Sequence, residues 1–281
     1  MPLYAFLLVI LAALIHATWN FTTKKTSGNF GVLYLGLLFS CFAFLPLLFF
    51  LPVSEILNSK AYPYFFATGT IHAIYFFALA KAYEHGDISV VYPIARGSGI
   101  AGTAVAAALF LHENLTFPGV VGISAIVAGT ILIGFKKAKQ KDHSKELFFA
   151  FVVGAAITGY SITDKLGVGT INPLAYIVGL ALVTTAVLTP YAIHKKRKEI
   201  SEAWKKSKKE SCIIGIGSLG TYIIILFVYK IVQVSYVVAL RELAVAFGTL
   251  FGFIFLKEQF TRSKIIGIIC IVSGMIIIKI I

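Results

Sequence analysis

Ten long runs of apolar residues follow one another along the chain, separated by short polar stretches. Each run holds about twenty residues, the length at which an α-helix crosses the ~30 Å hydrocarbon layer of a membrane. Phe, Leu and Ile succeed one another without the strict alternation that is typical of β-barrel strands. The pattern therefore predicts an all-α membrane protein whose ten transmembrane helices cover residues 3–21, 30–52, 62–82, 88–111, 117–135, 147–164, 173–193, 211–229, 235–256 and 263–280.

The composition supports this prediction and limits the functions open to the chain. Hydrophobic residues make up 58% of the 281 positions and charged residues 13%, about half the ~25% that is typical of soluble proteins. Ten helices leave short loops and tails, so no soluble catalytic or receptor domain fits. The three cysteines are too far apart in the sequence for metal-ligand spacing, and there is no His-x3-His motif. We therefore expect no metal site and no cofactor.

The net charge of +13 is distributed very unevenly over the predicted loops. Most of the 25 Lys and Arg residues fall in the loops that join spans 1–2, 3–4, 5–6, 7–8 and 9–10, which share one face of the membrane. The other face carries Lys60, Lys165, Lys230 and Lys279. Because cytoplasmic loops are the basic ones, we expect an inner-membrane protein with both termini outside the cytoplasm. The charge then reports orientation, and no nucleic-acid partner is expected.

Two halves of the chain share a motif at a fixed separation. His112–Thr116 reads His-Glu-Asn-Leu-Thr after the fourth span, and Lys257–Thr261 reads Lys-Glu-Gln-Phe-Thr 145 residues later, after the ninth. The same separation joins Gly122 to Gly267, Gly129 to Gly274, and Arg96 to Arg241. Each half has five spans, an odd number, so the second half enters the membrane upside down. We expect repeats at residues 1–137 and 147–281, a basic cytoplasmic linker at 138–146, and a cytoplasmic loop or short surface helix at 194–210.

Two five-helix repeats, each with Glu-x-[Leu/Phe]-Thr before a final Gly-x6-Gly helix, resemble the drug/metabolite transporter superfamily in its EamA-type ten-helix branch. The resemblance covers essentially the whole chain. It implies a carrier with a central cavity and alternating access, and it marks Glu113 and Glu258 as structural residues that cap helix ends or stabilise loops. Superfamily substrates range from amino acids and organic cations to nucleotide sugars, so the cargo stays open. His16–Asn20 also resembles a subset of EamA-like proteins associated with aminophosphonate use.

Charged residues inside the predicted spans are the first candidates for a binding site, because burying them in hydrocarbon costs ~2.5–3.5 kcal/mol each. Arg96 and Arg241 are equivalent in the two repeats. A guanidinium stays charged and binds carboxylate or phosphonate with two hydrogen bonds, so the pair is interpreted as two anion-binding forks. The alternative is that each arginine pairs with backbone carbonyls or with a carboxylate, for which Glu242 and Asp164 are the candidates.

Aromatic and histidine residues form a second set of candidates. His16, Trp19 and Asn20 share one helix face by their i, i+3, i+4 spacing, and His72, Tyr75 and Phe76 repeat that spacing in the third span. Such faces suit an ammonium group through cation–π attraction, whereas Trp and Tyr near span ends more often form an interfacial belt. Further aromatic candidates for the cavity are Tyr92, Tyr160 and Tyr222.

These observations predict a secondary carrier, not an enzyme, that moves a small polar metabolite. Two intramembrane arginines beside aromatic faces favour an amino-acid-like or aminophosphonate-like zwitterion, or an organic anion. Export of organic cations or drugs is the alternative within the superfamily. A lipid-phosphate enzyme and a non-transporting sensor are alternatives from other classes, and the first would need clustered carboxylates or histidines. Expected partners are the substrate and the bilayer, with the chain a monomer or homodimer. Proton coupling is left open, with candidates Glu242, Asp164, His16 and His72.

Overall fold

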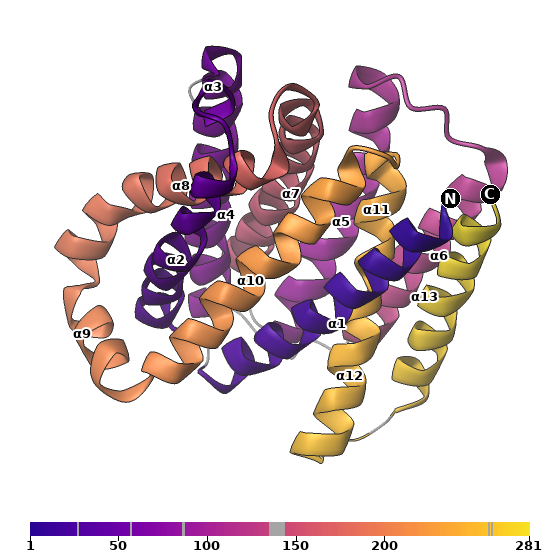
Figure 1. Ribbon diagram of the computed structural model, residues 1–281. Coiled ribbons are helices and arrows are strands. Elements are labelled where there is room, and N and C mark those ends of the chain that lie inside the picture. The colour runs from indigo at the N-terminus through magenta and orange to yellow at the C-terminus, as the bar shows by residue number, and fades with distance from the viewer. Residues whose placement is uncertain (27, 57, 86–87, 135–143, 258, 260) are drawn as a thin grey trace.

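A computed structural model describes residues 1–26, 28–56, 58–85, 88–134, 144–257, 259 and 261–281, and this part of the chain is helical with no strand (Figure 1). Ten helical stretches within it are long and apolar enough to cross a membrane, which confirms the predicted fold class. The elements are α1 (Leu3–Lys25), α2 (Phe30–Phe44), η1 (Leu45–Phe50), α3 (Val53–Ile56), η2 (Ser59–Ala61), α4 (Tyr62–His85), α5 (Ile88–Phe110), α6 (Phe117–Gly134), α7 (Ser144–Thr170), α8 (Pro173–Lys195), α9 (Arg197–Lys206), α10 (Lys208–Tyr229), α11 (Val234–Leu240), α12 (Leu243–Leu256) and α13 (Arg262–Ile280).

The ninth predicted span, 235–256, is divided into two helices. Arg241 and Glu242 form a turn between α11 and α12. Around this turn the backbone bonds tighten from i→i−4 to i→i−3, with the Glu242 amide on the Ala239 carbonyl at 3.0 Å and the Val245 amide on the Glu242 carbonyl at 2.8 Å. Tightening of this kind inside a helix marks a local break. The break places both charged side chains in the interior of the protein.

Two charged segments predicted to lie outside the membrane, 194–210 and 138–146, are described in whole or in part. The charged segment 194–210 contains the short helix α9, as the sequence suggested. Of the predicted linker 138–146, residues up to 143 lie outside the described part of the chain, and Ser144 already begins α7.

The repeated motifs adopt the same backbone geometry. His112 and Lys257, which are equivalent, have left-handed φ angles of 52° and 53°, and each ends a transmembrane helix. A left-handed residue is a common way to terminate a helix. Four residues later, the hydroxyls of Thr116 and Thr261 accept hydrogen bonds from the backbone amides of Gly119 at 3.2 Å and Lys264 at 3.4 Å. Each motif therefore stops one helix and caps the next.

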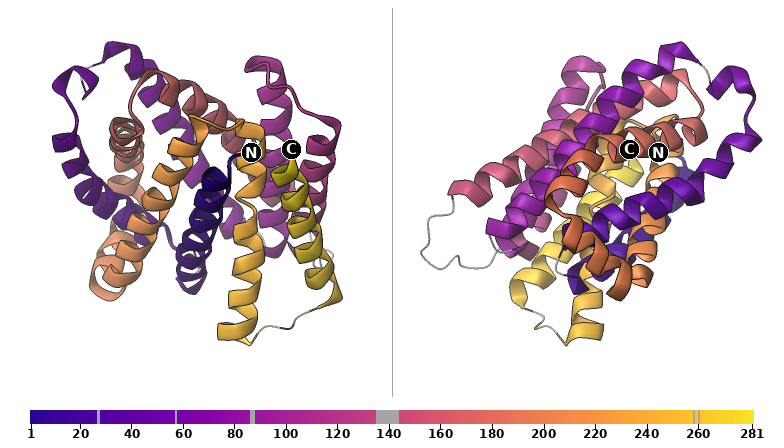
Figure 2. Two further views of the ribbon diagram at one scale, coloured as in Figure 1. Left: turned by 45° about the vertical axis from the view of Figure 1, so that its right-hand side comes forward. Right: turned by 90° about the vertical axis from the view of Figure 1, so that its left-hand side faces the viewer.

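The two repeats pack against each other through equivalent helices. α6 lies antiparallel beside α13 (Figures 1 and 2). At their crossing, Gly122 faces the Gly274 carbonyl and Gly129 faces that of Gly267, so that an added Cβ would meet backbone. Gly122 is equivalent to Gly267 yet contacts Gly274, a crosswise pattern that follows when the second repeat is inverted. Other helix contacts show the same crosswise pattern. α1 packs on α10 and α12 of the second repeat, and its equivalent α7 packs on α4 and α5 of the first.

The distribution of polarity is that of a membrane protein. Large apolar side chains are exposed on the outside, among them Phe49, Phe50 and Phe117, and this surface suits lipid. Among the described residues, four charged side chains are buried instead, namely Arg96, Asp164, Arg241 and Glu242. The two termini meet, with the Lys279 Nζ donating to the Met1 carbonyl at 3.1 Å, and they lie away from α9 (Figure 1).

Candidate functional site

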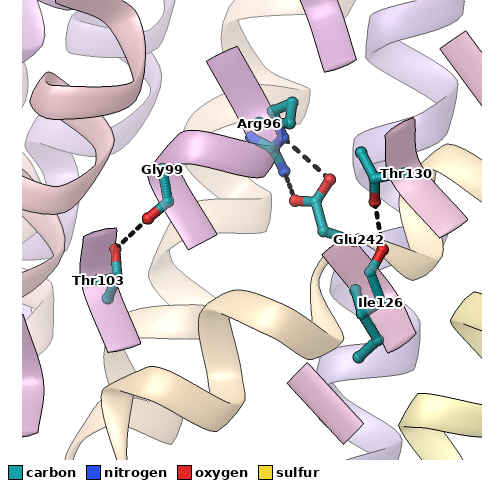
Figure 3. Close-up of polar contacts among 6 residues, drawn as sticks. All are labelled: Arg96, Gly99, Thr103, Ile126, Thr130 and Glu242. Atoms are coloured by element: carbon teal, nitrogen blue, oxygen red, sulfur yellow. Dashed lines mark hydrogen bonds and ion pairs between the residues drawn. The ribbon is translucent and has the colours of Figure 1, made fainter. Parts of the chain in front are cut away.

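Arg96 and Glu242 form a buried ion pair between the repeats. Arg96 comes from α5, and Glu242 from the break between α11 and α12. The Arg96 Nε donates to the Glu242 Oε2 at 3.1 Å, and a second guanidinium nitrogen donates to Oε1 (Figure 3). Arg96 is 7% exposed and Glu242 1%. Two parallel charge-assisted bonds are the strongest arrangement that these side chains can make. The anion-binding fork predicted at Arg96 is therefore occupied by the protein's own carboxylate.

Arg241 has no such partner. Its side chain is 7% exposed, its Nε makes no hydrogen bond, and it has no ion-pair partner among the residues that the structure describes. Its guanidinium carbon lies 5.4 Å from the centre of the Tyr222 ring, within the range of a cation–π interaction. A buried donor without an acceptor is costly. The two equivalent arginines therefore differ: Arg96 is paired with Glu242, and Arg241 has no ion-pair partner among the described residues.

Aromatic rings from three helices surround this cation on one side. His72 of α4 stacks on Tyr160 of α7, with ring centres 4.3 Å apart, and meets the edge of Tyr222 of α10 at 5.5 Å. Tyr160 and Tyr222 lie 6.0 Å apart, and Tyr75 extends the group from Tyr160 at 6.0 Å. The sequence analysis proposed these four residues from three separate spans, and the structure brings them together.

A buried carboxylate adjoins the same rings. Asp164 of α7 is fully buried and accepts hydrogen bonds from the hydroxyls of Thr68 (α4), Tyr176 (α8) and Tyr222. Tyr222 therefore touches both Asp164 and Arg241. We call Arg241, Tyr222, Tyr160, His72 and Asp164 the Arg241 cluster.

Helix α1 contributes His16 to the surroundings of the two arginines. His16 lies close enough to Arg96 and Arg241 to interact electrostatically with both. Its ring is 4.5 Å from that of Trp19, whose Nε1 is buried without a hydrogen-bond partner among the described residues. Asn20, the third residue of this face, is half-buried. An indole donor and a guanidinium donor thus both lack acceptors in the interior.

Phe76, another predicted site residue, lies apart from the cluster. Phe76 touches Tyr75 at 5.3 Å, but it packs into a separate apolar cavity between α2, α4 and α8 with Phe30, Tyr34 and Leu188. Phe76 lies on the same helix face as His72, but it is one turn further along α4 and so lies beyond the rings of the cluster. The Tyr92 side chain lies outside the described part of the structure.

The sequence analysis missed Tyr176 and Thr68. Tyr176 is one of thirteen tyrosines and stands in an apolar span without a polar neighbour. Thr68 precedes His72 by one helical turn, and this spacing is a sequence signal that both residues lie on one polar helix face.

Glu113 caps the helix that leads to Arg241. Its carboxylate accepts hydrogen bonds from the backbone amides of Val234 at 2.6 Å and Ser235 at 3.2 Å, and from the Ser235 hydroxyl at 2.6 Å. These amides begin α11, so Glu113 of the first repeat caps a helix of the second. The capping role predicted for it is confirmed, whereas Glu258 lies outside the described residues.

Comparison with known proteins agrees with the repeat architecture. The family model described as "EamA-like transporter family" matches the chain twice, over residues 3–135 and 144–280. The chain belongs to the EamA-like transporter family. It is therefore a multi-pass membrane protein of a transporter family built from two repeats, as the motifs indicated.

Relatives and a solved structure extend this comparison over the full length of the EamA-like chain. Proteins of Listeria monocytogenes and Listeria innocua, each named "Putative sugar uptake protein", are 22% identical to it over 97% of either chain. A crystal structure superimposes with a TM-score of 0.80 at 16% identity, covering 99% of this chain and 96% of its own. At that identity the likeness shows the fold alone.

Proposed function

We propose that the protein is a secondary carrier that moves a small metabolite with an anionic group, such as an amino-acid-like or aminophosphonate-like zwitterion or an organic anion. The observation that carries the proposal is the buried Arg241 without a counter-ion, beside an arginine that Glu242 neutralises. A carboxylate or phosphonate supplies the missing acceptor. The rings of Tyr222 and Tyr160 suit the ammonium end of a zwitterion.

The inverted repeats supply the movement. Carriers of this build bind substrate between the repeats near the midplane and expose it to either side by rocking one half against the other. The Arg241 cluster draws its residues from α4, α7, α10 and the α11–α12 break, so both repeats contribute. We place the protein in the cytoplasmic membrane with both termini outside, because the basic loops, including α9, define the inner face.

Sugar uptake is a second candidate. The names of the two Listeria relatives suggest it, and aromatic rings that suit an ammonium group also stack on the apolar face of a sugar. A neutral sugar, however, leaves the Arg241 charge uncompensated. The two candidates therefore differ in whether transport depends on that charge.

The test is counterflow in liposomes that contain the purified protein and are loaded in turn with unlabelled alanine, 2-aminoethylphosphonate, malate or glucose. We expect uptake of the matching labelled compound for at least one of the three with an anionic group. Arg241→Gln should abolish it, and Lys230→Gln, which removes an exposed cation at a loop, should not. Uptake of glucose alone, undiminished in Arg241→Gln, would favour the sugar candidate. Absence of uptake for all four compounds would contradict the proposal.

A further inference from the structure

Asp164 is a buried carboxylate held by hydroxyl groups from three different helices. No cation is bonded to it among the residues that the structure describes; its partners are Thr68, Tyr176 and Tyr222. Hydroxyls compensate only part of the cost of an ionised carboxylate in the membrane interior. Addition of one proton removes that charge without any movement of the helices. Asp164 is therefore a buried carboxylate whose charge a single proton would neutralise.

The hydrogen bonds indicate which oxygen receives the proton. The Asp164 Oδ1 accepts from both Thr68 and Tyr176, whereas Oδ2 accepts from Tyr222 alone. A proton added to Oδ2 turns that oxygen into a donor toward the Tyr222 hydroxyl oxygen. The Tyr222 hydroxyl hydrogen must then point elsewhere. No covalent bond other than the new O–H is formed or broken.

Tyr222 also contacts Arg241, with its ring centre 5.4 Å from the guanidinium carbon. We propose that Asp164 is a proton-binding site and that Tyr222 couples its protonation to anion binding at Arg241. The coupling, unlike the proton site, rests on the proposed function. In the protonated state the Tyr222 hydroxyl hydrogen is free to bond to the anion, and the two negative charges of Asp164 and the anion no longer oppose each other. Proton and anion therefore bind more tightly together than either does alone.

Several other ionisable groups lie around Asp164. On α4, the His72 Nδ1 lies 2.9 Å from the Thr68 carbonyl oxygen and 3.1 Å from the Thr68 hydroxyl oxygen. On α7 itself, Lys165 points away and donates to the carbonyls of Tyr229 and Val232. Arg96 of α5 is paired with Glu242. The remaining groups that face Asp164 are Tyr176 of α8, Tyr222 and Tyr229 of α10, and Arg241 at the α11–α12 break, and Tyr64 lies near Tyr176.

Infrared difference spectroscopy tests the proton site without any substrate. The full-length protein in phosphatidylcholine liposomes is titrated between about pH 9 and pH 4, a range that brackets ordinary and raised carboxyl groups. We expect a protonated-carboxyl C=O band that is absent from Asp164→Asn, retained in Asp164→Glu, and shifted in Tyr222→Phe, which lacks one hydrogen bond. Glu202→Gln, on the exposed surface of α9, should leave this band unchanged. Superimposable spectra of the wild type and Asp164→Asn would overturn the proton site.

A flux measurement tests the coupling. Liposomes filled with a pH-sensitive dye receive alanine, 2-aminoethylphosphonate, malate or glucose in turn. We expect one compound to change the internal pH with the wild type and with the exposed-loop variant Lys230→Gln, and Asp164→Asn to lose this change. Transport that is equally fast with and without an imposed pH gradient would overturn the coupling. A titrating Asp164 band without movement of any compound would instead contradict the proposed function and leave the proton site intact.

Discussion

Glu242 of the second repeat forms its ion pair with Arg96 of the first, although the residue equivalent to Glu242 in the first repeat is Gly97. The repeats are therefore symmetric in their arginines and asymmetric in the carboxylate between them. Gly97 has no side chain, so it cannot form the equivalent ion pair with Arg241. The centre of the protein is left with one compensated and one uncompensated cation, and this difference between equivalent positions sets the charge that we expect a substrate to bring.

Removal of one partner of this pair should destabilise the protein strongly. Glu242→Gln leaves the Arg96 charge buried without compensation, which typically costs ~3–5 kcal/mol. We expect a clear drop in the apparent Tm of the purified protein in detergent micelles. The double variant Arg96→Met with Glu242→Leu removes both charges and should recover most of the loss. Equal Tm values for Glu242→Gln and the wild type would show that the pair does not stabilise the fold.

The crossing of α6 and α13 should tolerate no added side chain. A Cβ at Gly122 or Gly274 would collide with the backbone of the opposite helix, so that Gly122→Ala and Gly274→Ala should each cost ~1–3 kcal/mol by overpacking. Gly248 offers the matched control, because it lies in α12 with no atom within 4 Å of an added Cβ. Gly248→Ala should be neutral or slightly stabilising, since Ala is the better helix former. Thermal unfolding of the three variants under one condition checks this, and similar losses at all three positions would contradict it.

Much of this architecture follows from the sequence because its causes are local or repeated. The length of the apolar runs determines the spans, and the paired motifs at His112–Thr116 and Lys257–Thr261 reveal the repeats. The break at Arg241 has no such signal, because no Pro or Gly interrupts the run from Ser235 to Ala246. Its cause is tertiary: Glu242 turns out of the helix toward Arg96.

The sequence predicted several residues of the candidate site but not the contacts between them. Arg241, His72, Tyr160 and Tyr222 were identified because buried charge and aromatic spacing are visible along a single helix. Their contacts were not, since each comes from a different element. Contacts between helices likewise determine that Arg96, and not Arg241, is neutralised by Glu242.

The cap at Glu113 should control the order of α11, the helix that leads to Arg241. Glu113→Gln keeps the shape of the side chain and removes the charge that accepts the Val234 and Ser235 amides. Loss of a helix cap costs ~0.5–2 kcal/mol, and here it should increase amide hydrogen exchange locally at the start of α11. Mass spectrometry of peptides covering residues 230–240 measures this. Glu202→Gln on exposed α9 is the control, and unchanged exchange in Glu113→Gln would argue against the capping role.

The basic face should lie in the cytoplasm, with Lys230 on the opposite side. A cysteine-free variant, in which Cys41, Cys212 and Cys270 are replaced by Ala, accepts single cysteines at the exposed positions Lys206 and Lys230. Because Lys and Arg are retained on the inner side, a membrane-impermeant maleimide should label Lys230→Cys in intact cells and Lys206→Cys only after permeabilisation. The two variants control each other for reactivity, since both reach full labelling in detergent. The reverse pattern would place α9 and the basic loops outside the cell and would contradict the predicted orientation.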